Sequence, residues 1–209
     1  MEVYQRVYNH GYAEDFLSSF SVEFCSCIDS IRDTRKIRKH YAILRHDVDY
    51  SLCNALAMAK IKSNLGIKSS YFLLHPDGVL CKKNYFGQVE NGKLEIFPWL
   101  IDAALYLQDL GHEVGLHNDL VSLWIGTGMH PRNALGEMLN LLRAKGINIV
   151  GTVAHGSALC KQFHYVNSKL FAVGENYAEK FGRKNPLLVT LSNKKSLELF
   201  KLNVKDFDL

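Results

Sequence analysis

Apolar residues along the middle of the chain alternate between short runs and helical repeats. Short apolar runs, typical of buried strands, occur at residues 41–44, 67–74, 112–119 and 147–153. Between these runs, apolar residues recur every three or four positions and predict amphipathic helices at residues 52–65, 98–108 and 132–144. Alternating strands and helices favour parallel strands joined by crossover helices, so the expected fold class is α/β.

The two ends of the chain are less regular than this middle part. Apolar residues recur at helical spacing from Phe16 to Ile28, which predicts an outer helix over residues 13–31. Towards the C-terminus, Leu187–Leu191 has the pattern of a strand, and Leu197–Leu202 fits a strand or a helix. At 209 residues we expect a single domain. Its expected parts are a helix at 13–31, a core at 41–157 and a C-terminal region of uncertain placement at 158–209.

Ionisable residues lie at the ends of three of the four predicted strands or directly after them. They are Arg45, His46, Asp47, Asp49, His117, Asp119 and His155. Because the carboxyl ends of parallel strands meet at one edge, we expect these side chains to converge. Asp47 and Asp49 alternate with Val48 and therefore point the same way in extended backbone. Such a pair suits one carboxylate on a metal and a neighbouring base for water, although a strand end capped by salt bridges has the same pattern.

Composition and charge narrow the class of protein only modestly. The chain is 47% hydrophobic and 22% charged, which is ordinary for a globular protein. The net charge of +4 comes from scattered residues without interleaved aromatics, so no nucleic-acid partner is expected. We find no secretory signal and no apolar run of ~18 residues, so no transmembrane segment is expected. Five irregularly spaced cysteines favour reduced thiols and a cytoplasmic location.

Two sequence blocks resemble the polysaccharide deacetylase superfamily, whose members are also called NodB-homology or carbohydrate esterase 4-like domains. The first is Arg45-His46-Asp47-Val48-Asp49, followed by a helix and by Gly66-Ile67-Lys68-Ser69-Ser70-Tyr71-Phe72. The second, Gly111-His112-Glu113-Val114-Gly115-Leu116-His117, is similar to the family's Gly-His-Glu-Ile-Gly-x-His strand. The resemblance covers roughly residues 41–157 and is nearest to the His-Asp-Val-Asp variants that accompany surface-polysaccharide and O-antigen biosynthesis. It implies a distorted (β/α) barrel, complete or incomplete, and a divalent metal, usually zinc.

The resemblance also implies roles for individual residues. Asp47 matches the first acid of the family motif, the catalytic base, and Asp49 matches the acid that binds metal. His117 matches the first histidine ligand. Beside them, Arg45 is expected to pair with a site carboxylate and His46 to lie behind the site rather than to bind the metal.

The expected third ligand departs from the family pattern. The family's second histidine lies four residues after the first, and this chain has Val121 there. Asp119 and His155 are the available replacements, since zinc accepts both carboxylate oxygen and imidazole nitrogen. The family's C-terminal histidine, its general acid, has no match after His164, so His155 is also a candidate to return a proton to the leaving amine.

The function implied by the resemblance is metal-assisted removal of an acyl group, typically acetyl, from an amino sugar in polysaccharide or glycolipid biosynthesis. Two alternatives stay open at this point. One is a non-catalytic sugar-binding or assembly protein that keeps the fold and has lost part of the metal site. The other is a small-molecule amidohydrolase on the same fold.

Overall fold

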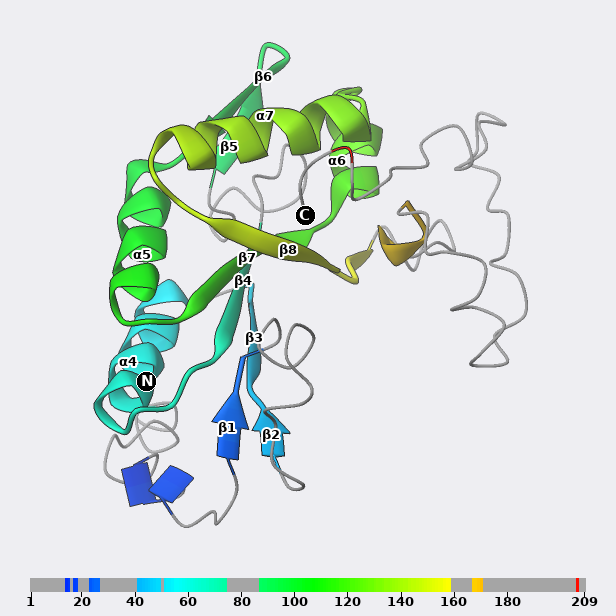
Figure 1. Cartoon of the computed structure of the whole chain (residues 1–209). Helices are drawn as coiled ribbons and strands as arrows, with labels where there is room; N and C mark the ends of the chain where they lie inside the picture. Colours follow the sequence, from blue (N-terminus) through cyan, green and yellow to red (C-terminus); the bar gives the residue numbers. More distant parts are fainter. Residues whose placement is uncertain are drawn as a thin grey trace, which may run out of the picture.

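Figure 1 shows the chain as a computed structural model. The structure describes residues 14–15, 17–18, 23–26, 41–49, 51–74, 87–158, 167–170 and 206. The strand expected at Leu187–Leu191 and the segment Leu197–Leu202 lie outside the described residues.

A parallel four-stranded sheet forms the centre of the described structure. Its strands are β3 (Arg45–Val48), β4 (Ser70–Leu74), β7 (Glu113–Asn118) and β8 (Ile149–Ala154), in the order β3-β4-β7-β8. Every neighbouring pair in it runs parallel, so all four carboxyl ends lie at one edge. Two smaller pairs complete the described strands: parallel β1 (Glu23–Cys25) with β2 (Tyr41–Ile43), and antiparallel β5 (Gly87–Glu90) with β6 (Lys93–Ile96).

Helices connect successive strands of the sheet. They are α4 (Leu52–Asn64), α5 (Pro98–Asp109), α6 (Leu120–Thr127) and α7 (Pro131–Ala144), with a 3-10 turn at Asn167–Leu170. Ser51 caps the N-terminal end of α4, because its hydroxyl accepts a hydrogen bond from the Asn54 amide at 3.4 Å. At the C-terminal end of α4, Gly66 has φ +69°, a left-handed conformation that glycine adopts without a Cβ penalty.

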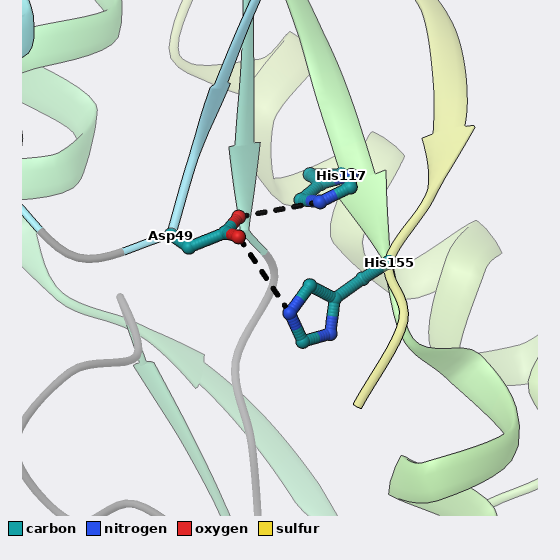
Figure 2. Close-up of side chains that lie close together, drawn as sticks. All are labelled: Asp49, His117 and His155. Carbon is teal, nitrogen blue, oxygen red and sulfur yellow. Dashed lines mark ion pairs between the residues drawn. The ribbon is translucent and has the colours of Figure 1, made fainter. Parts of the chain in front are cut away.

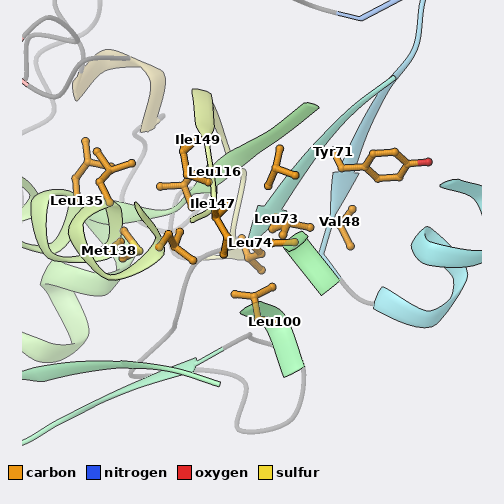
Figure 3. Close-up of a cluster of buried hydrophobic side chains, with 14 of the residues drawn as sticks. Val48, Tyr71, Leu73, Leu74, Leu100, Leu116, Leu135, Met138, Ile147 and Ile149 are labelled. Atoms are coloured by element: carbon orange, nitrogen blue, oxygen red, sulfur yellow. The ribbon is translucent and has the colours of Figure 1, made fainter. Parts of the chain in front are cut away.

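The hydrophobic core lies between the sheet and these helices (Figure 3). The sheet contributes residues such as Leu73, Leu116 and Ile149, each at most 4% exposed. The facing stripe of α7 contributes its core side chains at helical spacing: Leu135, Met138, Leu139 and Leu142. Burial of the two surfaces against each other fixes the helices on the sheet and leaves its carboxyl edge to polar residues.

Several predicted boundaries need correction. The helix expected over residues 13–31 is wrong at Glu23–Cys25, which forms β1 and pairs with β2. Here pairing with a strand distant in sequence overrides the local helical spacing. The strand predicted at residues 41–44 is β2, and a separate strand, β3, follows it, so Arg45 and Asp47 lie on a strand rather than after one. Helix α6 was not predicted, because its apolar run lacks an amphipathic repeat.

The α/β class is confirmed, with parallel strands joined by helices. Closure into a barrel stays a prediction, because the described strands form an open sheet and two separate pairs. Among the described helices, none has the length and apolar character needed to cross a membrane.

Candidate metal centre

Asp49, His117 and His155 form a cluster at the carboxyl edge of the sheet. Asp49 follows β3, His117 lies near the end of β7, and His155 follows β8. Their side chains point toward one another (Figure 2), and one ligand atom of each lies within 4.8 Å of the others. The convergence expected from the polar strand ends is therefore confirmed for these three residues.

The separations within the cluster suit a shared metal ion. The Nε2 atom of His117 is 3.2 Å from Oδ1 of Asp49, and Nε2 of His155 is 3.7 Å from Oδ2 of the same carboxylate. Two ligands of a tetrahedral zinc ion lie about 3.4 Å apart, given metal–ligand bonds of about 2.1 Å. The two imidazole rings stand nearly perpendicular, at 85° with centroids 5.0 Å apart, so both can turn a nitrogen toward one point.

The hydrogen bonds of the two Nδ1 atoms determine the tautomers of His117 and His155. Nδ1 of His117 lies 3.3 Å from the carbonyl oxygen of Val153, and Nδ1 of His155 lies 3.3 Å from Oδ2 of Asp119. Both partners can only accept, so each Nδ1 donates and each neutral ring carries a lone pair on Nε2. Two lone pairs therefore face the Asp49 carboxylate.

The charge of the cluster also suits a cation. Oδ1 of Asp49 is buried and has no hydrogen-bond partner among the described residues. Burial lowers the pKa of His117, against the opposing attraction of the Asp49 carboxylate, and so favours the neutral ring. A neutral imidazole and an unpartnered buried carboxylate oxygen are what a metal cation requires, so the residues present fit such an ion.

Asp47 stands next to the cluster without belonging to it. Its Oδ2 accepts a 2.8 Å charge-assisted hydrogen bond from the Arg45 guanidinium, which confirms that Arg45 pairs with a site carboxylate. The side chain of Asp47 is 29% exposed. Its charge acts on the pKa of His117, so the two side chains are electrostatic neighbours. Asp47 is thus accessible to water and close to the cluster.

His46 points to the opposite side of β3, as alternation along a strand requires. Its ring stacks on Tyr71 with centroids 4.7 Å apart, and its Nε2 contacts the Lys62 amine of α4. Burial, followed by the charge of Lys62, lowers the pKa of His46 to about 4. The structure therefore places His46 behind the site, on the helix side of the sheet.

Of the two replacements expected for the third ligand, the structure brings His155 into the cluster. Asp119 is 2% exposed and lies behind His155, where it contacts Nδ1 rather than the cluster. Val121 is fully buried in α6 and belongs to the hydrophobic core. Position 121, where the superfamily that the sequence resembles has a histidine, is therefore a packing position in this structure.

Ser122 and Asn167 contact Asp119 and were not predicted as site residues. The Ser122 hydroxyl donates to Oδ1 of Asp119 at 2.5 Å, and the Asn167 amide donates to the same oxygen at 2.7 Å. Asp119, directly before α6, is a typical residue for a helix start, and that signal could have directed attention to the first turn, where Ser122 lies. Asn167 is 48 residues from Asp119, and nothing local in the sequence marks it.

Comparison of the chain with protein-family models, with curated proteins and with solved structures finds no match.

Proposed function

We propose that Asp49, His117 and His155 bind a divalent cation, zinc, and that the protein is a metal-dependent amide hydrolase. The supporting observation is the convergence of two Nε2 lone pairs on a carboxylate whose buried Oδ1 has no donor among the described residues. Two imidazoles and one carboxylate are a ligand set of catalytic zinc, with positions left open for water and substrate.

A cation bound there supplies Lewis acidity, which polarises a carbonyl oxygen and makes water easier to deprotonate. The chain itself supplies the base. Asp47 is accessible, lies beside the cluster and is held by Arg45 through a hydrogen bond that leaves its other carboxylate oxygen available. We assign Asp47 to take the proton from the attacking water.

Amide hydrolysis also needs a proton for the departing nitrogen. Water adds to the carbonyl carbon, the C–N bond breaks, and the products are a carboxylate and an amine. A ring whose Nε2 lone pair binds a cation and whose Nδ1 proton is bonded to Asp119 has no proton to give, so the ligand and acid roles of His155 exclude each other. We therefore assign His155 to the metal and the return of the proton to Asp47.

The proposed substrate is an N-acetylated amino sugar of polysaccharide or glycolipid biosynthesis. Support for the sugar comes from the two blocks that resemble the deacetylase superfamily, around Asp47 and His117. Support for the hydrolysis comes from the cluster, which suits other amides equally well. The assay must therefore include amides that are not sugars.

Elemental analysis of protein purified without chelator tests the metal. We expect close to one zinc per chain in wild type and almost none in Asp49→Ala, because loss of one ligand of a three-ligand site rarely leaves tight binding. Zinc, iron, cobalt, nickel and manganese are measured together, since two histidines and a carboxylate also suit iron. Full zinc content in Asp49→Ala would place the metal elsewhere.

Acetate release from N-acetyl substrates, and ring opening to the amino carboxylate for cyclic amides, test the reaction. The metal-loaded wild type is incubated with N-acetylated amino sugars in free, nucleotide-linked and lipid-linked form, and with simple and cyclic amides. We expect release from at least one sugar and none in Asp49→Ala. Metal-loaded wild type that hydrolyses no amide would refute the hydrolase, and hydrolysis of non-sugar amides alone would refute the deacetylase.

A further inference from the structure

Behind His155 lies a buried network that joins three segments of the chain. Its centre is Asp119, the residue before α6, whose carboxylate is 2% exposed. Oδ2 of Asp119 faces Nδ1 of His155 at 3.3 Å, while Oδ1 accepts from Ser122 and Asn167. A buried carboxylate is costly unless donors surround it, and these three donors satisfy it.

Asn167 uses both ends of its amide to connect these segments. Its Oδ1 accepts from the backbone amide of Val121 at 3.1 Å, and its Nδ2 donates to Asp119 at 2.7 Å and to the carbonyl oxygen of His155 at 2.8 Å. The opposite orientation would set its oxygen against a carboxylate and its NH₂ against an N–H, so the orientation is determined. Asn167 is fully buried, and its hydrogen bonds hold the start of α6 next to the residue after β8.

We propose that Asp119, held in place by Asn167 and Ser122, is the positioning residue of His155. Its carboxylate accepts a hydrogen bond from Nδ1–H of His155, which favours that tautomer and directs the Nε2 lone pair toward Asp49. A carboxylate on the far nitrogen of a metal-binding histidine orients the ring and raises its basicity. The use made of Nε2 rests on the proposed function, whereas the tautomer and the orientation are properties of the metal-free chain.

The tautomer can be read directly in the metal-stripped full-length protein. Long-range ¹H–¹⁵N spectra of ¹⁵N-histidine-labelled protein at pH 8 distinguish a ring protonated on Nδ1 from one protonated on Nε2. The signals of His155 are assigned by their loss in His155→Gln. We expect Nδ1–H in wild type and a large fraction of Nε2–H in Asp119→Asn, whose amide no longer requires a donor from the ring.

A matched control is available in Asn118. Like Asn167, it is a fully buried asparagine near the end of the sheet, but its Nδ2 donates to Thr152 and to the carbonyl oxygen of Val153. We expect Asn167→Ala to increase the Nε2–H fraction of His155 and Asn118→Ala to leave it unchanged. An equal effect of both would mean that any lost buried amide disturbs His155, which overturns the specific role.

Ser122→Ala covers the case in which the larger changes prevent folding. It removes a single donor to Asp119 and one hydroxyl contact to Ser157, so it is the mildest change in the network. We expect a smaller shift in the same direction. Wild-type His155 with its proton on Nε2, or an unchanged tautomer in every folded variant of Asp119, Ser122 and Asn167, would overturn the proposal.

Zinc affinity gives the second readout. Changes in such outer partners typically cost about 10–100-fold in metal affinity. We expect a loss of that size in Asp119→Asn and a smaller loss in Ser122→Ala. Unchanged affinity in Asp119→Asn would overturn the positioning role. If wild type binds no zinc at all, the proposed function fails, and the tautomer measurement still decides the role of Asp119.

Discussion

Lys62 is a buried amine that makes folding stability depend on pH. It lies in α4, is 1% exposed, and points to the helix side of β3. Its Nζ is 3.1 Å from the Tyr71 hydroxyl and 3.4 Å from the Ser69 hydroxyl, and it contacts Nε2 of His46. These three acceptors match the three N–H groups of an ammonium, but the described part of the chain offers Lys62 no carboxylate. Burial therefore lowers its pKa to about 7 from 10.5.

The sign of the effect follows from proton binding. Between pH 7 and pH 10.5 the unfolded chain holds a proton on Lys62 that the folded chain has released. The contribution of Lys62 to stability therefore rises with pH across that window and is constant below it, where both states hold the proton. At about 1.4 kcal/mol per pH unit, the gain from pH 7 to pH 10 is roughly 3–4 kcal/mol, allowing for partial titration at both ends.

The perturbation is Lys62→Met, which keeps the length of the side chain and removes the amine. Urea unfolding followed by circular dichroism is measured from pH 5 to pH 10 for wild type and variant. From pH 7 to pH 10, we expect the unfolding free energy of wild type to rise by roughly 3–4 kcal/mol relative to that of Lys62→Met. Lys60→Met, an exposed lysine on the same helix, is the control and should stay parallel to wild type. Parallel curves for Lys62→Met and wild type would refute the buried-amine account.

Three further changes test the site and the sheet. Asp47→Asn should lower turnover by a factor on the order of 10²–10⁴ and keep the bound metal, because a base contacts water; equal turnover in enzyme assays would remove Asp47 from the mechanism. Chelation of the metal should lower the melting temperature of wild type but not of Asp49→Ala, since a ligand at 100 times its Kd stabilises by about 2.7 kcal/mol. Gly115→Ala should destabilise by about 1–3 kcal/mol in denaturant titrations, because its Cβ would lie 2.4 Å from the Phe72 ring; Gly151→Ala, with no atom within 4 Å, should cost far less.

The sequence predicted well those features that depend on local pattern. Strands β4, β7 and β8 and helices α4, α5 and α7 follow the apolar spacing, whereas β5, β6 and α6 were not predicted. Asp49 and His117 were recognised because they end strands of one parallel sheet. Other missed features depend on contacts between distant residues. Strand β1 needs β2 as a partner, and Asn167 acts only because the fold brings it to Asp119. The choice between Asp119 and His155 as ligand was likewise beyond local pattern, because it depends on how β8 aligns with β7.

That alignment explains how His155 reaches the cluster in the absence of a histidine at position 121. Val114 pairs with Ile149, but Leu116 pairs with Thr152, so β8 carries one extra residue opposite Gly115. An extra residue shifts a strand by one place and turns every later side chain to the other face.

Past this irregularity His117 pairs with Val153, which sets His155 two residues further along the chain, directly after β8, and on the same face as Val153. On the other side, Val48 pairs with Leu73 and Leu74 pairs with His117, so Asp49 lies level with His117 across β4. A Cβ on Gly115 would lie 2.9 Å from the carbonyl oxygen of Gly151 within the irregular stretch, so the glycine leaves room for it. The position of the cluster thus follows from strand register. Gly115 of β7 and the extra residue of β8 place His155 on the same face as His117, and Asp119 orients its ring through Nδ1.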